Sequence, residues 1–321
     1  MSPDEFVEAL YELCLGRSPD PAGLAAWTAE LRATRDPIAI LAGMLSSPEA
    51  QLRRRVTESP ERLPSTDLTA GALAGLKRRP RVVDVGAQSL GDGTHPYSRL
   101  AEVTPTDIVG FDPLEDRLNE RRASEDVEGS IELLPFAIGD GATHTLHVNN
   151  FDATSSLFPL NAHHNADFNG LSSLETVRTE DVQTHRLDDV LPPGPIDFLK
   201  LDVQGAELMV LRGAERSVAI SAVVHCEAEF APIYEGQALY PEIHSELAQH
   251  EFALIDLIVT DRFHYLTKAG HSTPDRLLWA DAVFFRETDD AETLTMQALI
   301  AATVYAKPSL AEHLLERAGL R

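Results

Sequence analysis

Basic residues are scarce in this sequence. Its 321 residues include 27 Lys and Arg against 51 Asp and Glu, for a formal net charge of -24. A charge of this sign repels phosphodiester backbones, and no basic patch with interleaved aromatic residues offsets it. We therefore expect no nucleic-acid partner. The acidity also has a simpler interpretation, since a large net charge keeps a protein soluble.

Cysteine and long apolar runs are also scarce. The two cysteines, Cys14 and Cys226, are far apart, which favours free buried thiols in a reducing compartment over a disulfide. No apolar run reaches the roughly 18 residues that cross a bilayer. The acidic start, Met1–Glu5, lacks the basic n-region of a signal peptide. These absences predict a soluble cytoplasmic protein with no membrane span.

The first part of the chain has the spacing of short helices. Apolar residues recur every three or four positions between Pro3 and Arg55, with breakers between the runs. We expect a small all-helical domain over residues 1–57. A Pro- and charge-rich linker and one more helix then occupy residues 58–80.

The pattern changes after Pro80. Short β-rich runs alternate with helical ones, which is typical of a doubly wound, mostly parallel α/β sheet. The predicted strands are residues 81–86, 107–112, 131–139, 196–202, 222–230, 252–259 and, as an antiparallel strand, 277–286. This predicts an α/β domain over 81–289 and a helical extension over 290–321. We expect the long polar stretch 140–195 to be a functional or disordered loop.

The ends of the first two strands indicate a nucleoside cofactor. Doubly wound sheets bind ligands beyond the carboxyl ends of their strands, and here these ends hold Asp84, Gly86 and Asp112. A glycine lets the backbone approach a ligand, and an acid after the second strand can accept hydrogen bonds from ribose hydroxyls. Because the first turn has neither GxGxxG nor GK[ST], we expect a cofactor without a pyrophosphate.

The predicted strand 222–230 carries three polar groups on one face. His225, Glu227 and Glu229 alternate with apolar residues, so all three side chains point the same way. The end of this strand adjoins that of the preceding one, which places the cluster beside Asp202. Such a cluster could hold a general base, a metal ion or a hydroxyl-rich substrate.

Seven blocks of the sequence follow one another in the order of a known family. They are DVGA (84–87), FDP (111–113), LPFAIGD (134–140), TSSL (154–157), HRLDDV (185–190), DFLKLDVQGAELMVLRGAE (197–215) and AEFAPIYEGQ (228–237). In these blocks the chain resembles the FkbM family of S-adenosylmethionine-dependent methyltransferases. The resemblance covers about residues 80–286. It implies a Rossmann-like class I methyltransferase fold with a seven-stranded sheet, and S-adenosylmethionine as the methyl donor.

The resemblance also implies a cofactor site at the ends of the first three strands. Asp84 and Gly86 would line the methionine moiety, Asp112 would bind the ribose diol, and Phe136, Ala137 and Ile138 would lie beside the adenine. Ala87 and Pro113 are the other predicted cofactor contacts. Three features depart from the family pattern: Asp112 stands where Glu is commoner, QSLGDGTHPYS at 88–98 is longer than the usual tight loop, and Gln204 stands where many relatives have Glu.

The N-terminal block LYELCLGRSPDPAGLAAWTAEL, residues 10–31, resembles a second family. It is similar to the DUF4214 type of helical domain, which is often attached to bacterial surface-polysaccharide enzymes. We interpret Leu24 and Trp27 within it as core positions of a helical bundle.

Together these features predict O-methylation of a hydroxyl on a sugar, glycan or glycosylated metabolite. Asp202 and His225 are the candidate bases for the hydroxyl proton. Asp202 and Glu227, with Glu229, are alternatively oxygen ligands for a hard cation such as Mg²⁺. The predicted substrate contacts are Thr154, Ser155, Ser156, Glu227, Glu229 and Tyr234.

Two other functions stay open at this stage. One is methylation of a non-sugar small molecule, such as a polyketide or a lipid head group. The other is a module that binds S-adenosylmethionine or a glycan without turnover. The sequence also leaves open whether the chain forms a homo-oligomer.

Overall fold

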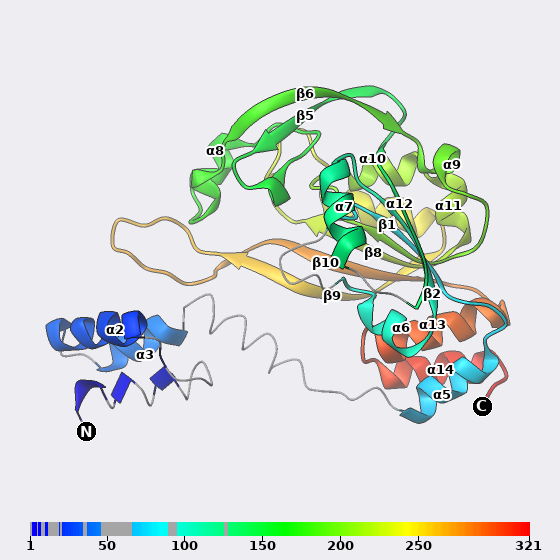
Figure 1. Cartoon of the computed structure of the whole chain (residues 1–321), viewed down its shortest axis with the longest axis horizontal. Helices are drawn as coiled ribbons and strands as arrows, with labels where there is room; N and C mark the ends of the chain where they lie inside the picture. Colours follow the sequence, from blue (N-terminus) through cyan, green and yellow to red (C-terminus); the bar gives the residue numbers. More distant parts are fainter. Residues whose placement is uncertain are drawn as a thin grey trace. The chain divides into compact units, whose positions relative to one another are not determined.

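The computed structural model divides the chain into two compact units, residues 1–63 and 64–321 (Figure 1). It describes residues 2–4, 6–7, 10–11, 19, 21–34, 37–45, 66–88, 95–124 and 128–321. Cys14 and most of the linker predicted within 58–80 therefore lie outside the described residues. None of the helices in the described part of the chain is long and apolar enough to cross a membrane.

Two of the helices predicted for the N-terminal region are described in the first unit. Its described helices are α2 (Pro21–Thr34) and α3 (Pro37–Leu45). Ile40 and Met44 are buried at the centre of its small core, and Leu24 and Trp27 pack against them. The core positions predicted for Leu24 and Trp27 are therefore confirmed.

The second unit is built on a seven-stranded sheet in the order β3-β2-β1-β7-β8-β10-β9. Its strands are β1 (Arg81–Val85), β2 (Thr106–Phe111), β3 (Gly129–Leu134), β7 (Ile196–Leu201), β8 (Ser221–Glu229), β9 (Phe252–Phe263) and β10 (Arg276–Arg286). Within this sheet β3, β2, β1, β7 and β8 are parallel to one another. β10 runs antiparallel to both of its neighbours, β8 and β9. The predicted doubly wound sheet and its antiparallel strand are confirmed.

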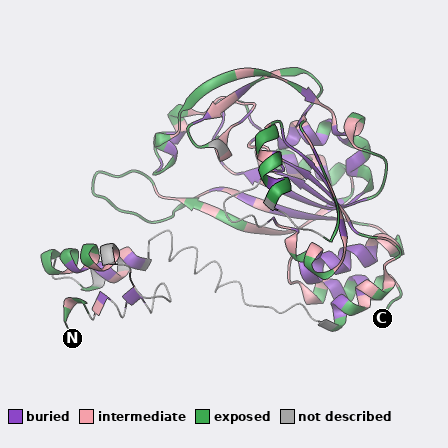
Figure 2. Cartoon of the chain, viewed as in Figure 1, coloured by how far each residue is buried: buried purple, intermediate pink, exposed green. Residues whose placement is uncertain are grey.

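Helices cover both faces of this sheet. One face packs against α9 (Leu187–Val190), α10 (Glu207–Arg212), α11 (Glu215–Ile220) and α12 (Tyr240–Gln249). The other packs against α5 (Thr66–Gly75), α6 (Ser98–Val103), α13 (Ala291–Thr303) and α14 (Pro308–Arg317). The sheet between them is the buried core, shown in purple in Figure 2. Cys226 lies in this core as a buried free thiol, as predicted.

The third predicted strand, 131–139, is interrupted in the structure. β3 ends at Leu134, because Pro135 has no backbone N–H to continue the ladder. After Phe136 the chain forms β4 (Ala137–Ile138), which belongs to a second sheet. The single predicted strand is thus two short strands in different sheets.

The stretch 140–195 is folded and contains regular elements. β5 (Thr143–Asn149) pairs antiparallel with β6 (Thr176–His185), and β4 pairs with the other edge of β6. Between them lie η1 (Asp152–Thr154), α8 (Ala162–Asn165) and η2 (Leu171–Ser173). The two long strands arch over one end of the main sheet (Figure 1). Of the two alternatives for this stretch, the disordered loop was wrong. Most residues of β6 are polar and exposed, so no apolar pattern marked it as a strand.

Candidate active site

Acidic side chains gather where the parallel strands end. Asp84 lies on β1, Asp112 follows β2, Asp202 follows β7 and Glu227 lies near the end of β8. Since β2, β1, β7 and β8 are adjacent, these carboxyl ends share one edge of the sheet. The predicted proximity of Asp202 and Glu227 is present, because one side-chain amide bonds to both.

Gly86 allows β1 and β7 to end close together. Its φ is +82°, and a Cβ on it would lie 1.9 Å from the Asp202 backbone oxygen. A side chain here would clash with backbone, which cannot move aside as a flexible side chain can. The glycine therefore fixes the position of Asp202 relative to the first turn.

Asp84 is the buried centre of an ion network. Its Oδ2 accepts hydrogen bonds from Arg121 Nη1 at 2.8 Å and from the Tyr97 hydroxyl at 2.6 Å. Burial raises the pKa of a carboxyl, but the charges of Lys200 and Arg121 outweigh it and hold the pKa of Asp84 at about 2. Asp84 and Ala87 are both fully buried. Among the described residues, neither lines the cavities described below.

Lys200 joins this network to the site. Its Nζ donates to the Gly86 backbone oxygen at 2.9 Å and lies 3.2 Å from Asp84 Oδ1 and 3.3 Å from Asp202 Oδ2. Burial lowers the pKa of a lysine, yet the two carboxylates raise the pKa of Lys200 above its ordinary value. Lys200 therefore stays charged and orients Asp202.

A first cavity, the β2 cavity, lies beyond β1, β2 and β4. Six of the eight predicted cofactor residues line it: Gly86, Asp112, Pro113, Phe136, Ala137 and Ile138. Apolar side chains of the second sheet, Leu146 and Val182, line it too, together with Leu157 from the segment between β5 and β6. This combination of an apolar slot and a strand-end carboxylate suits an aromatic base joined to a ribose.

Asp112 is the polar group of the β2 cavity. Its Oδ1 accepts the Leu114 N–H at 2.8 Å, and no bond to the other oxygen is found within the described ranges. Burial raises the pKa of Asp112 to about 6, although the Leu114 bond and Lys200 work against this. The second oxygen is available to accept hydrogen bonds from a diol.

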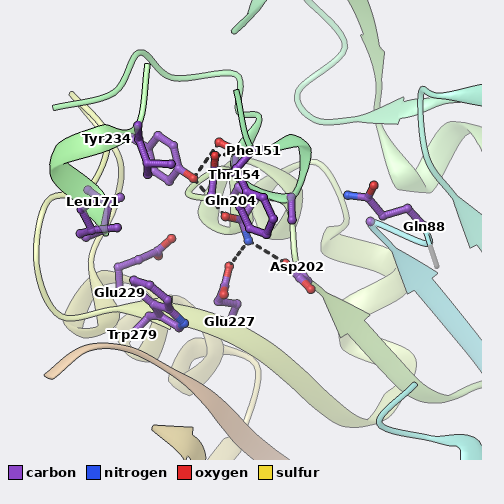
Figure 3. A pocket seen from close by; sticks show the side chains of 14 residues that line it. Gln88, Phe151, Thr154, Leu171, Asp202, Gln204, Glu227, Glu229, Tyr234 and Trp279 are labelled. Carbon is purple, nitrogen blue, oxygen red and sulfur yellow. Dashed lines mark hydrogen bonds between the residues drawn. The ribbon is translucent and has the colours of Figure 1, made fainter. Parts of the chain in front are cut away.

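A second cavity, the β8 cavity, lies beside the ends of β7 and β8 (Figure 3). Asp202, Glu227 and Glu229 supply its carboxylates. Its remaining lining is Gly86, Gln88, Phe151, Ala153, Thr154, Leu171, Leu174, Gln204, Ile233, Tyr234 and Trp279. Gly86, Gln88, Asp202 and Gln204 line the β2 cavity as well, so the two cavities meet at Asp202.

The Gln204 side chain forms hydrogen bonds with three other residues that line the β8 cavity. Its Nε2 donates to Asp202 Oδ1 at 3.0 Å and to Glu227 Oε2 at 2.6 Å, as the dashed lines in Figure 3 show. Its Oε1 accepts from the Tyr234 hydroxyl at 3.0 Å. The residue has φ +54°, a conformation that non-glycine residues seldom adopt. A glutamate at this position would have no N–H with which to join the two acids.

The acids of β8 are not arranged as metal ligands. Burial and the nearby carboxylates raise the pKa of Glu227 and of Glu229 well above the ordinary value. The Gln204 amide bridges Asp202 and Glu227 through two hydrogen bonds. No group of three or more His, Cys, Asp or Glu side chains in the described part of the chain could hold a metal ion. The Mg²⁺ site predicted at Asp202 and Glu227 thus finds no support.

The predicted substrate residues divide between the two cavities. Thr154 and Tyr234 line the β8 cavity, and the Tyr234 hydroxyl bonds to the Thr154 backbone oxygen at 2.9 Å. Ser155 and Ser156 instead line the β2 cavity. The Ser156 hydroxyl donates to the Gln204 backbone oxygen at 2.6 Å, which connects the second sheet to the loop after β7.

His225 faces a third cavity, the α6 cavity, which is lined by residues of α6 and by Val304 and Tyr305 after α13. Its Nε2 lies 3.2 Å from Asp281 Oδ2 and its Nδ1 lies 3.1 Å from the Tyr305 hydroxyl. Both ring nitrogens of this buried histidine are therefore engaged. Asp202 and Glu227 also line the α6 cavity, so it adjoins the β8 cavity.

Several site residues had no signal in the sequence. Arg121 and Tyr97 contact Asp84 across 37 and 13 residues of sequence, and neither belongs to a block of the resemblance. Trp279 reaches the β8 cavity from β10, which was predicted as a strand without a role in the site. Only the pairing of β10 with β8 places it there.

Comparison with known proteins identifies both parts of the chain. Residues 84–254 match the Methyltransferase FkbM domain, and residues 1–53 match a domain of unknown function, DUF4214. None of the curated proteins matches the chain. The first match covers more than half of the 321 residues.

Solved structures with a related arrangement are remote in sequence. Magnesium protoporphyrin IX methyltransferase (ChlM) from Synechocystis PCC 6803, solved with bound SAM, is 10% identical, with 89% of this chain and 98% of that chain covered and a TM-score of 0.35. The N-terminal domain of EvdMO1, solved with SAH, is 11% identical over 70% of this chain and 83% of that chain, with a TM-score of 0.31.

The strand order with its one antiparallel strand is that of the class I methyltransferase fold. The match over residues 84–254 covers the strand ends that form the β2 and β8 cavities. From this domain match and this sheet, the chain belongs to the FkbM family of S-adenosylmethionine-dependent methyltransferases.

Proposed function

We propose that this protein transfers a methyl group from S-adenosylmethionine to a hydroxyl of a sugar, glycan or glycosylated metabolite. One observation carries the proposal: the carboxylate of Asp202 lies where the β2 and β8 cavities meet. A group at this junction can contact both a donor in one cavity and an acceptor in the other. Such positioning supplies much of the rate of a two-substrate reaction.

The β2 cavity is our proposed cofactor site. The ribose hydroxyls would donate to the free oxygen of Asp112, and the adenine would lie between Phe136 and Ile138. When bound there, S-adenosylmethionine supplies an electrophilic methyl on a sulfonium. Gly86 leaves the room in which the methionine end would approach Asp202. Asp84 would not touch the cofactor itself. It would hold Lys200 and the turn after β1 in place.

The β8 cavity is our proposed acceptor site. Its carboxylates and the Tyr234 hydroxyl offer hydrogen-bond partners to a polyhydroxylated ring, and Trp279 and Phe151 offer apolar faces. Thr154 would complete this wall. Ser155 and Ser156 would support it through the Gln204 loop and would not touch the acceptor directly.

Asp202 is our proposed proton acceptor. The acceptor oxygen would form its bond to the methyl carbon as the sulfur–carbon bond breaks, with the bonding pair leaving on sulfur. The hydroxyl proton would pass to the Asp202 carboxylate, whose side chain is 25% exposed and so reachable from the cavity. His225 is the second candidate, and it would first have to be released by Tyr305 or Asp281.

The test is methyl transfer by the Asp202→Asn variant. With radiolabelled S-adenosylmethionine and a panel of glycosides, we expect transfer by the wild type and a loss of about 100-fold or more in turnover for the variant. Binding of S-adenosylhomocysteine should stay within about threefold, since the isosteric amide keeps the cavity shape. The exposed Asp275→Asn variant is the control. Full activity of Asp202→Asn would remove Asp202 as the base.

A further inference from the structure

The lining of the β8 cavity is acidic without a basic counterpart. Of its 14 described lining residues three are carboxylic acids, and none is Lys, Arg or His. Lys200 forms an ion pair with Asp202 at 3.3 Å. In the described structure, the Glu227 carboxylate instead accepts a hydrogen bond from the neutral amide of Gln204. The acids of β8 therefore lack a protein cation within this cavity.

Glu229 is buried and has a carboxylate oxygen without a hydrogen-bond partner in the described structure. Its side chain is only 2% accessible, and the oxygen concerned is Oε2. A side-chain hydrogen bond with Gln237 favours the ionised form, but burial and the nearby Glu207 outweigh it and raise the pKa of Glu229. An unpartnered buried acceptor of this kind is costly unless a ligand supplies a donor.

Glu227 and Glu229 line the same part of the β8 cavity. They are two residues apart on β8 and so lie on one face, roughly 7 Å apart along the strand. Figure 3 shows both carboxylates beside the same opening, below Tyr234 and Gln204. A single small group placed between them can contact both.

The rest of the cavity suits a positive charge. Trp279, Tyr234 and Phe151 supply aromatic rings, whose faces attract cations. A neutral sugar hydroxyl donates one hydrogen bond and brings no positive charge that would favour the ionised form of the two acids. An ammonium donates three and compensates the charge as well.

We propose that the β8 cavity accepts a substrate with an ammonium group, as in an amino sugar, held between Glu227 and Glu229. The ammonium is the recognition group, and a hydroxyl of the same ring faces Asp202. This inference rests on the proposed function, because it assigns the acceptor of that same site.

The experiment compares amino sugars with their neutral parents. Calorimetric titrations use the full chain saturated with S-adenosylhomocysteine, in EDTA, with D-glucosamine, D-galactosamine and D-mannosamine as probes. Each is matched with its parent hexose and its N-acetyl derivative, which has no charge. We expect at least one amino sugar to bind about tenfold or more tightly than both of its neutral counterparts.

Charge-neutral variants assign this preference to residues. Glu229→Gln and Glu227→Gln keep the side-chain shape, and we expect each to reduce the preference for the amine to within about twofold. The exposed Glu235→Gln, on the loop after β8, is the matched control and should keep it. S-adenosylhomocysteine affinity should be unchanged in all three variants.

Two results separate this inference from the function on which it rests. If S-adenosylhomocysteine binds but no amino sugar binds more tightly than its neutral counterparts, the ammonium site is overturned and the methyltransferase proposal stands. If the preference persists in both glutamine variants, the assignment to Glu227 and Glu229 is overturned. Failure to bind S-adenosylhomocysteine would instead count against the proposed function.

Discussion

At the scale of single residues, the acids at the strand ends have different environments and therefore different roles. Asp84 is fully buried among Lys200, Arg121 and Tyr97, and its pKa is about 2. At Asp112 burial outweighs the charge of Lys200 and the Leu114 hydrogen bond, and raises the pKa to about 6. The first organises the turn, while the second is left with an oxygen for a ligand. Two aspartates that look alike in the sequence thus differ in function.

Asp112 makes a prediction about pH. Hydroxyl donors favour the ionised carboxylate, so S-adenosylhomocysteine affinity should fall as the pH drops below about 6. At pH 5 we expect about tenfold weaker binding than at pH 7.5, because roughly one carboxyl in ten is then ionised. Calorimetry at several pH values measures this.

The control is Asp112→Asn, which should bind more weakly with a flat profile over this range. The raised pKa also has a consequence for stability. Its favourable contribution is complete below the ordinary pKa near 3.8 and is lost as the pH rises through about 6. The same pH profile in the variant and the wild type would show that another group titrates.

At the scale of elements, much of the main sheet could be predicted and much of the site geometry could not. Strands such as β7 and β8 are short runs rich in apolar and β-branched residues and bounded by turns, which local patterns reveal. The interruption at Pro135 and the exposed strand β6 were missed, since neither follows a simple apolar alternation. Six of the eight predicted cofactor residues do line one cavity.

The contacts between elements lie beyond any local pattern. Arg121 on α7 (Glu115–Ser124) reaches back to Asp84 and to the Ala87 backbone oxygen, both at 2.8 Å. The placement of Trp279 depends on the register between β10 and β8. Sequence spacing fixes which face of a strand a residue occupies, but neighbouring strands decide what it meets.

The junction of β1 and β7 makes a prediction at this scale. Gly86→Ala puts a methyl 1.9 Å from the Asp202 backbone oxygen, so the two strand ends must separate. We expect it to lower the free energy of unfolding by about 3 kcal/mol or more and S-adenosylhomocysteine affinity by at least tenfold. Urea denaturation and calorimetry measure the two effects.

Gly270→Ala is the matched control for backbone strain. Gly270 has φ +73°, and a Cβ there would meet nothing within 4 Å. The substitution should cost only about 1–2 kcal/mol and leave affinity unchanged. Equal losses of affinity in the two variants would mean that the close approach at Gly86 does not shape the site.

At the scale of the whole molecule, every residue that lines the three cavities belongs to the second unit, residues 64–321, among those described. The helical unit over residues 1–63 has its own small core. The chain as a whole is acidic, with a net charge of -24, and the β8 cavity shares this sign. A cationic acceptor would therefore be attracted to the molecule before it reaches the site.

The central claim is that the strand ends of the second unit bind S-adenosylmethionine. Calorimetric titration of the full chain with S-adenosylhomocysteine tests this most directly. We expect saturable binding at one site per chain, abolished by prior saturation with S-adenosylmethionine and weakened in Asp112→Asn. Absence of binding by both compounds at pH 7.5, in protein shown to be folded, would contradict the account.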